Sequence, residues 1–296
     1  MTISNITVAT YNILDPRLAK KHHGVLPKEL RSSTSWEARR DPLKRNIESS
    51  KADILCLQEC SSAAFVSLAI SLRNTLAPAI RIPHGSNDGP AIFYNPNRFS
   101  LLKASYLHHE DSHRVTVFAN LLDLTTGKTI RVASLHILGK HFRAIGKHQL
   151  EEALSAQELR PADVFIAAGD FNENLKKRGS RARALLRSGY KIYQPKHSTE
   201  VGRKQRTFDG FAVKTSGSDC SLKTVSVART IGKKFPVASD HRLVAGTLSL
   251  RCTHVKKYKG NRLLNIISQN FSSFLLYMNH FVHRAVAKLF SKPQQL

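Results

Sequence analysis

The stretch Val164-Phe165-Ile166-Ala167-Ala168-Gly169-Asp170-Phe171-Asn172 decides how the chain is expected to fold. Its apolar run stops at Gly169, a pattern typical of a buried strand that ends at a surface. Such an end favours chemistry, because neighbouring strands hold the backbone while the following side chains reach into a cleft. Asp170 could bind a hard cation or act as a base, and Asn172 could orient a water molecule or a phosphate oxygen. Asp-x-Asn after glycine is also ordinary turn chemistry, so the hypothesis of a site needs support from other strands.

Length, composition and charge limit the classes of protein to which the chain can belong. It has 296 residues, of which 41% are hydrophobic, and it shows no internal repeat. These values predict a single α/β domain with an appendage. The formal net charge of +25 favours polyanionic partners such as nucleic acid, anionic lipid head groups or polyphosphates. The charge does not choose among them, and a solvated basic surface without a ligand is the alternative.

The cysteines and the first residues bear on the cellular compartment. The cysteines form no Cys-x-x-Cys pair, which favours buried free thiols in a reducing compartment. They are Cys56, Cys60, Cys220 and Cys252. No apolar signal region follows the first five residues, so we expect no cleavable signal peptide and an intracellular, cytoplasmic location.

Three further strands are expected to end in a polar side chain, as the first one does. A strand over 6–14 carries Asn12 near its end, and a buried strand over 53–59 finishes in Glu59. A strand over 129–135, the second half of a hairpin with 115–124, is followed by His136. Each residue alone is more often structural or merely exposed, but the repetition favours a shared site.

The remaining pattern alternates strands with helices. Asp41 is expected to begin a helix with Pro42 in its permitted first turn, and Asn87-Asp88-Gly89-Pro90 is expected to turn the chain into a strand. The stretch 176–187 predicts a strongly basic helix next to the presumed cleft, and Arg203, Lys204 and Arg206 extend the same positive potential. Helices are predicted over 41–50, 61–77, 143–159 and 176–187, and short strands over 91–94, 207–213 and 238–250.

An acidic residue and an Asp-His pair complete the candidate set. Asp209 lies inside the predicted strand over 207–213, and Asp240-His241 opens the final one. A carboxylate beside a histidine fixes the tautomer of the ring and raises its pKa, which suits phosphate chemistry near neutral pH.

The ordered motifs resemble those of the endonuclease/exonuclease/phosphatase superfamily of metal-dependent phosphoesterases. The resemblance covers about residues 6 to 250, and the branch of nocturnin-type and Angel-like deadenylases is the most similar. The superfamily motifs are Thr10-Tyr11-Asn12, Leu57-Gln58-Glu59, Ser134-Leu135-His136, Gly169-Asp170-Phe171-Asn172, Phe208-Asp209-Gly210-Phe211 and Ser239-Asp240-His241. Branch-like features are Thr10-Tyr11-Asn12-Ile13-Leu14, Ser35-Trp36-Glu37-x-Arg39, the stretch 52–59 and Gly89-Pro90-Ala91-Ile92-Phe93-Tyr94. Gly210 and Ser134-Leu135 depart from the branch pattern, and both departures bear on substrate preference.

The resemblance implies a fold and a role for each matched residue. The fold would be a DNase I-like four-layer α/β sandwich, in which two facing mixed β-sheets are flanked by helices. Glu59 would hold Mg²⁺, with Mn²⁺ as a substitute, and Asn12 and Asp240 would complete or support its shell. Asp170 would orient or deprotonate the attacking water, and Asn172 would hold that water or a phosphate oxygen. His241, steered by Asp209, would stabilise the charged phosphorus centre, while His136 would grip a non-bridging oxygen.

These roles predict a Mg²⁺-dependent phosphoesterase that hydrolyses phosphodiester bonds of nucleic acid. An RNA exonuclease of deadenylase type is favoured over a DNA nuclease. One alternative is a phosphatase acting on a phosphoinositide, a nucleotide or an RNA-terminal phosphate. The other is a non-catalytic module that binds nucleic acid or membrane.

The composition changes after residue 250, which divides the chain into a domain over 1–250 and a basic linker with an amphipathic helix over 251–296. Apolar residues recur at alternating steps of three and four, as in a helix with one apolar face. They are Leu264, Ile267, Phe271, Phe274, Met278 and Phe281. The segment is too polar to predict a membrane span. A helix packed on protein and an interfacial helix that brings 262–290 onto anionic membrane are the two open readings.

Overall fold

The structure is a computed structural model that describes residues 2–21, 23–26, 28–31, 34–84, 87–201, 206–216, 220–231 and 238–252. The chain divides into two units, Met1–Tyr258 and Lys259–Leu296, and the second unit lies outside the described residues. The predicted linker, the C-terminal helix and its membrane contact therefore stay predictions. None of the helices in the described part has the length and hydropathy that a membrane crossing requires.

Strands and helices alternate along the first unit. The strands are β1 (Thr2–Asn12), β2 (Ile54–Gln58), β3 (Ala77–Arg81), β4 (Ala91–Tyr94), β5 (Phe99–His109), β6 (Arg114–Asp123), β7 (Thr129–His136), β8 (Val164–Asp170), β9 (Lys191–Tyr193), β10 (Asp209–Thr215), β11 (Cys220–Ile231) and β12 (Leu243–Cys252). The α-helices are α1 (Pro16–Lys21), α2 (Lys28–Arg31), α3 (Trp36–Ser50), α4 (Ser62–Ser71), α5 (Arg143–Glu158) and α6 (Ser180–Arg187). Single 3₁₀ turns are η1 (His23–Val25), η2 (Glu110–Ser112), η3 (Lys140–Phe142) and η4 (Leu175–Lys177).

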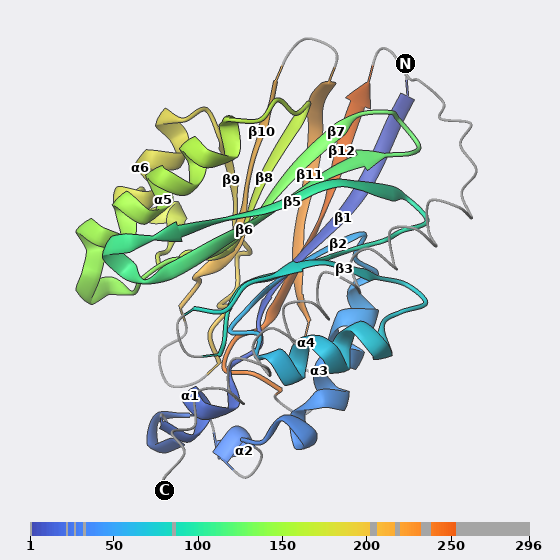
Figure 1. Ribbon diagram of the computed structural model, residues 1–296. Helices are drawn as coiled ribbons and strands as arrows, with labels where there is room; N and C mark the ends of the chain where they lie inside the picture. Colours follow the sequence, from blue (N-terminus) through green and yellow to red (C-terminus); the bar gives the residue numbers. More distant parts are fainter. Residues whose placement is uncertain are drawn as a thin grey trace, which may run out of the picture. The chain divides into compact units, whose positions relative to one another are not determined.

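Two six-stranded mixed sheets face each other (Figure 1). The first has the order β11-β12-β1-β2-β4-β3, and the second has the order β5-β6-β7-β8-β10-β9. In each sheet one central pair is parallel, β1 with β2 and β7 with β8, while the other pairs are antiparallel. Apolar side chains from both sheets, such as Val8, Ile54 and Ile166, form the core between them.

Helices cover the outer faces of the sheets. A second apolar cluster lies between the second sheet and α5 and α6, and it includes Phe165, Leu150 and Leu185. Helices α3 and α4 lie on the side of the first sheet (Figure 1). Strands β2 and β8 are buried along their whole length, because a sheet covered on both sides hides both faces of its central strands. The predicted four-layer α/β sandwich is confirmed.

Several predicted boundaries differ from those observed. Helix α3 begins at Trp36 rather than at Asp41, because Ser35 caps it by accepting a hydrogen bond from the backbone N–H of Ala38. Pro42 therefore lies inside the helix and not at its first position. The predicted basic helix over 176–187 is broken, since Arg178 adopts a left-handed conformation between η4 and α6. Strands β3, β5, β9 and β11 were not predicted, and α4 ends at Ser71 rather than at Ala77.

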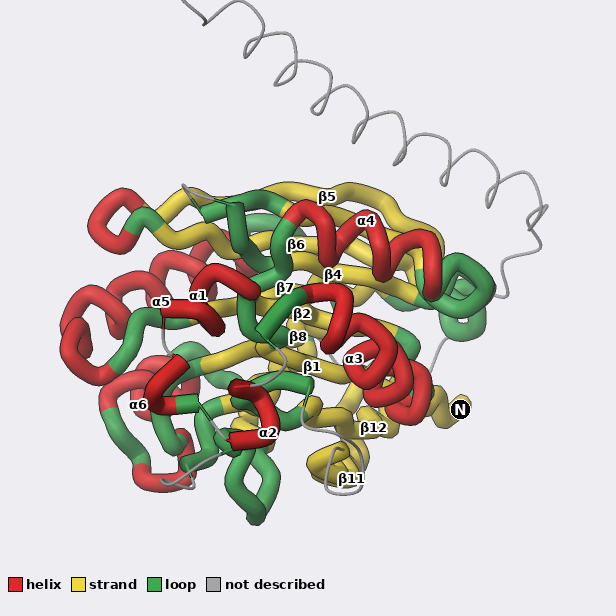
Figure 2. The backbone as a smooth tube through the Cα atoms, turned by 90° about the horizontal axis from the view of Figure 1, so that it is seen from below, coloured by secondary structure: helices red, strands yellow, loops and turns green. Residues whose placement is uncertain are grey.

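The parallel pairs position the candidate site, because the carboxyl ends of parallel strands meet at one edge of a sheet. Asn12 lies in register with Gln58 across β1 and β2. Across the second sheet, Asp170 lies in register with both His136 on β7 and Asp209 on β10. Figure 2 looks onto this end of the sheets, in front of which α1 and α2 lie. The strand ends that the sequence singles out are thus gathered at one end of the domain.

Candidate active site

The backbone turns sharply where the strands deliver their polar side chains. Leu14, Glu59 and Asn172 have positive φ angles of 57°, 53° and 49°. Residues other than glycine adopt this conformation at a cost, and it persists where surrounding structure holds it. All three lie just after a strand of the site, so the turns that carry the polar residues of the site are held in a strained conformation by the surrounding structure.

Glu59 is the hub on the first sheet. Its carboxylate accepts hydrogen bonds from Asn12 Nδ2 at 2.9 Å and from the backbone N–H of Asp15 at 3.1 Å, and it lies 3.8 Å from His136 Nε2. Burial, followed by the nearby charge of Asp240, raises the pKa of Glu59 to about 7. An ionised Glu59 is therefore a buried anion that needs a cation beside it.

Asp170 connects the two sheets. Its Oδ2 lies 3.4 Å from Asn12 Nδ2, 3.8 Å from His136 Nε2 and 3.7 Å from His241 Nε2. Burial raises the pKa of Asp170 to about 6, although the positive charge of His241 opposes the shift. The carboxylate thus lies between two histidines and beside Glu59, and it can accept a proton near neutral pH.

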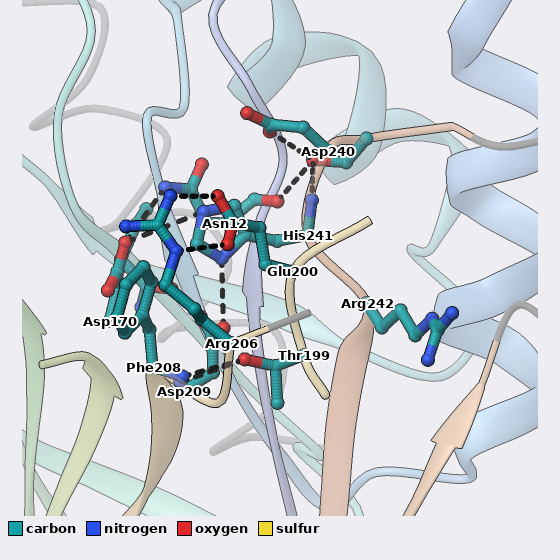
Figure 3. Close-up of polar contacts among 12 residues, drawn as sticks. Asn12, Asp170, Thr199, Glu200, Arg206, Phe208, Asp209, Asp240, His241 and Arg242 are labelled. Atoms are coloured by element: carbon teal, nitrogen blue, oxygen red, sulfur yellow. Dashed lines mark hydrogen bonds and ion pairs between the residues drawn. The ribbon is translucent and has the colours of Figure 1, made fainter. Parts of the chain in front are cut away.

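Asp209 is the partner of His241. His241 Nδ1 lies 2.8 Å from Asp209 Oδ2 (Figure 3). The Asp209 side chain is fully buried. Burial alone would lower the pKa of His241, but the carboxylates of Asp209 and Asp170 outweigh it and hold that pKa well above its usual value. His241 is therefore a charged imidazolium whose Nε2–H faces Asp170. The adjacent Asp240 does not form this pair.

His136 is held in the opposite charge state. Arg114 Nη1 lies 2.9 Å from His136 Nδ1, and a guanidinium can only donate, so Nδ1 accepts and Nε2 carries the proton. Burial, followed by the positive charge of Arg114, holds the pKa of His136 well below its usual value. The structure thus presents a neutral donor toward Glu59 and Asp170. Arg114 was not among the predicted site residues, although it directly precedes the strand over 115–124 that was expected to pair with 129–135.

The last two predicted residues take more peripheral positions. Asn172 donates from its backbone N–H to Asp170 Oδ1 at 2.8 Å and from Nδ2 to the Ile137 carbonyl at 2.9 Å. Asp240 is half-buried, and its Oδ1 lies 3.4 Å from Ser239 Oγ. Among the described residues, no hydrogen bond joins the Asp240 side chain to Glu59, and its charge acts on Glu59 through space.

Arg39 ties two loops of the site together. Its guanidinium donates to the carbonyls of Ile13 at 2.7 Å, Leu14 at 2.7 Å and Ala238 at 3.0 Å, and the residue is only 1% exposed. This arginine therefore joins the turn after β1 to the loop that carries His241. The arginine of the Ser-Trp-Glu-x-Arg motif thus stabilises the loops of the site.

The predicted basic face beside the site is partly wrong. Arg181 is 1% exposed and donates to the carbonyls of Phe171 and Leu138. It therefore stabilises the turn after Asp170 and does not face a ligand. Arg178 and Lys177 remain exposed. Arg203 and Lys204 lie outside the described residues.

The donor set fits a hard divalent cation. Carboxylate oxygens of Glu59 and Asp170 share two neighbours, Asn12 Nδ2 and His136 Nε2, and both groups are buried with raised pKa values. A cation between such oxygens would offset the cost of ionising them. The Asn12 carboxamide turns its nitrogen to Glu59, while its Oδ1 accepts from the Leu14 N–H at 3.1 Å. Asn12 is therefore placed to support Glu59 and not to supply an oxygen ligand.

A second group satisfies the spacing of a metal site within the described part of the chain. Ligand atoms of Asp170, Asp209 and His241 lie within 4.8 Å of one another. Within this group the Nδ1 of His241 lies 2.8 Å from the Oδ2 of Asp209, at hydrogen-bonding distance.

Comparison with known proteins finds relatives among the nocturnins. Nocturnin from Xenopus laevis is 24% identical over 237 residues, which are 72% of this chain and 59% of that protein. Nocturnin from Mus musculus is 25% identical over 238 residues, 72% of this chain and 54% of that protein. The chain thus spans little more than half of these relatives, and only 29% of nocturnin from Drosophila melanogaster.

Solved structures show the same fold. ANGEL2, a 2',3'-cyclic phosphatase crystallised with adenosine-2',3'-vanadate, superposes with a TM-score of 0.64 at 19% identity, over 84% of this chain and 96% of that one. The human Nocturnin catalytic domain with bound sulfate gives a TM-score of 0.59 at 18% identity, over 85% and 97%. The sequence pattern of the Endonuclease/Exonuclease/phosphatase family matches residues 9–256. The chain, with its paired strand ends and its carboxylate and histidine cluster, belongs to the endonuclease/exonuclease/phosphatase family.

Proposed function

We propose that this protein is a Mg²⁺-dependent phosphodiesterase that hydrolyses RNA, of exonuclease or deadenylase type. One observation carries the proposal: the Asp170 carboxylate lies 3.8 Å from a neutral histidine and 3.7 Å from a charged one, beside the buried carboxylate of Glu59. Phosphodiester hydrolysis needs an activated water, charge stabilisation on the phosphoryl oxygens and help for the leaving group.

The described side chains can divide these tasks. Asp170 accepts the proton of the attacking water, because with a pKa of about 6 it is ionised at neutral pH yet still basic. His241, kept charged by Asp209, donates from Nε2 to the phosphoryl group and supplies the proton that the leaving oxygen takes up when its bond to phosphorus breaks. His136 donates from its Nε2–H to a non-bridging oxygen, since Arg114 occupies Nδ1. Asn172 positions Asp170 through its backbone N–H.

Glu59 would hold the Mg²⁺ ion, with Asp170 adjacent and Asn12 orienting the Glu59 carboxylate. Bound Mg²⁺ supplies Lewis-acid stabilisation of negative charge on the phosphoryl oxygens. Mn²⁺, which also prefers oxygen ligands, would substitute. Asp240 contributes negative charge near Glu59.

The net charge of +25 supports a long polyanion as the substrate. The nocturnin relatives and the likeness to ANGEL2 support RNA over DNA. The likeness to ANGEL2 also favours a second candidate, a phosphatase that acts on an RNA-terminal phosphate.

A substrate panel tests both candidates. Poly(A), mixed-sequence RNA, RNA ending in a 2',3'-cyclic phosphate, duplex DNA and an inositol phosphate are incubated with and without Mg²⁺. RNA is expected to be shortened only with Mg²⁺. Loss of this activity in His241→Asn would support the role of His241 in hydrolysis. The control Glu48→Gln changes an exposed carboxylate paired with Lys44 and should keep the activity. Phosphate release without shortening would favour the second candidate. Cleavage of none of them would leave a non-catalytic binding module.

A further inference from the structure

Arg206 forms a rigid planar unit beside the site (Figure 3). Its Nε lies 2.8 Å from Glu200 Oε2 and its Nη2 lies 3.1 Å from Glu200 Oε1, which is a two-point arrangement. The centre of its guanidinium lies 5.1 Å from the centroid of the Phe208 ring. The Glu200 carboxylate and the Phe208 ring together hold the guanidinium in one orientation.

The part of the Arg206 side chain that stays exposed suits a flat, uncharged ligand. Glu200 neutralises the charge and occupies one edge of the guanidinium, so a phosphate would have to compete with that carboxylate. The guanidinium carbon of Arg206 lies over the Phe208 ring, yet 40% of the Arg206 side chain is exposed. A guanidinium plane and an aromatic ring are the groups on which unpaired bases stack.

The backbone places this unit next to the reacting groups. Glu200 pairs with His241 in an isolated β-bridge, and the N–H of Val201 donates to the carbonyl of Asp240 at 2.7 Å. Phe208 immediately precedes Asp209, and its carbonyl accepts from the N–H of Phe171 at 3.0 Å. Residues neighbouring both His241 and Asp170 thus anchor the unit.

We propose that Arg206 and Phe208 form a stacking subsite for an unpaired nucleobase of the nucleotide next to the scissile phosphate. The inference rests on the proposed function, since it names how a nucleic acid substrate is held. It gives the site a preference for single-stranded substrate, because a base within a duplex has no free face to offer.

The test uses two short oligoribonucleotides, one with 2-aminopurine at its 3' end and one with an abasic nucleotide there. Binding of the first to the unmodified protein should quench the fluorescence of 2-aminopurine. Arg206→Lys keeps the charge beside Glu200 but has no plane, so quenching should fall and the Kd should rise roughly tenfold, at the low end for stacking of one base. For the abasic oligonucleotide, the Kd of Arg206→Lys should stay within about twofold of the Kd of the unmodified protein.

A second site variant and a control variant complete the test. Phe208→Leu keeps the apolar volume and removes the ring, so it should repeat the effect if Arg206→Lys fails to fold. Arg187→Lys is the control, because Arg187 is an exposed arginine that also pairs with a glutamate. Equal losses for both oligonucleotides, unchanged quenching in the site variants, or no quenching by the unmodified protein would overturn the stacking subsite. Quenching without Mg²⁺-dependent cleavage would refute the proposed function and leave the subsite standing.

Discussion

Replacing Glu59 by glutamine should make the metal-free protein more stable at alkaline pH while it removes the response to Mg²⁺. Burial and Asp240 raise the pKa of Glu59 to about 7 from its ordinary value of 4.5. At about 1.4 kcal/mol for each pKa unit, the difference amounts to roughly 3 kcal/mol. Only 11% of the Glu59 side chain is exposed, so solvent screens little of this cost.

The sign follows from proton binding by the two states. Between pH 4.5 and 7 the folded protein keeps the proton on Glu59 while the unfolded chain has lost it. The free energy of unfolding therefore falls as the pH rises through this window, and the full cost is present above it. Glutamine never ionises, but it forfeits one of the two hydrogen bonds from Asn12 and Asp15, worth about 1 kcal/mol.

Thermal unfolding in EDTA measures the balance. At pH 8 the Glu59→Gln protein should unfold with a free energy roughly 2 kcal/mol higher, a rise in Tm of about 4 to 8 °C. At pH 4.5 it should be no more stable than the unmodified protein. Mg²⁺ should raise the Tm of the unmodified protein and of Glu48→Gln, but not that of Glu59→Gln. An equal loss of stability at both pH values, or an undiminished response to Mg²⁺, would refute the assignment of Glu59 as a buried anion awaiting a cation.

Three further outcomes are expected. Asp209→Asn should lower kcat roughly 100-fold, as loss of a general acid does. It should also move the alkaline limb of the pH–rate profile to lower pH, because Asp209 helps to hold the pKa of His241 above its usual value. An unmoved limb would contradict the pairing of Asp209 with His241. Gly169→Ala should destabilise the fold far more than Gly24→Ala, since a Cβ at Gly169 would lie 2.0 Å from the Leu135 carbonyl oxygen, whereas nothing lies within 4 Å at Gly24; urea denaturation of the two variants decides this. RNA affinity should fall with added salt, with a slope of about 0.7 per neutralised phosphate in a plot of log affinity against log salt concentration, and a salt-independent Kd would exclude a polyanion as the principal ligand.

Local sequence pattern was sufficient for the strand ends. Each of Asn12, Glu59, His136 and Asp170 stands where an apolar run stops, and the structure gathers all four at one end of the two sheets. Burial on both faces leaves central strands uniformly apolar, so the first polar residue after such a run marks the edge of the core. The fold class followed from these runs and their motifs, since both are properties of consecutive residues.

Edge elements were harder to predict. Strand β5 exposes Leu102 and Tyr106, and β9 has three residues, so neither shows the apolar run that identifies β2 or β8. Helix α3 begins earlier than its apolar spacing indicates, because Ser35 caps its first turn and that turn buries Trp36 and Arg39.

The choice of partners within the site belongs to the tertiary structure. His241 pairs with Asp209, 32 positions away, and not with its neighbour Asp240, because the register of β10 on β8 sets Asp209 opposite Asp170. Arg114 reaches His136 from another strand and so selects which ring nitrogen carries the proton. The apolar runs along the chain determine which residues lie at strand ends, since a buried strand requires consecutive apolar residues. Which of those residues touch, and with which charge, depends on strand register and on desolvation by distant segments, and these exist only once the sheets have paired.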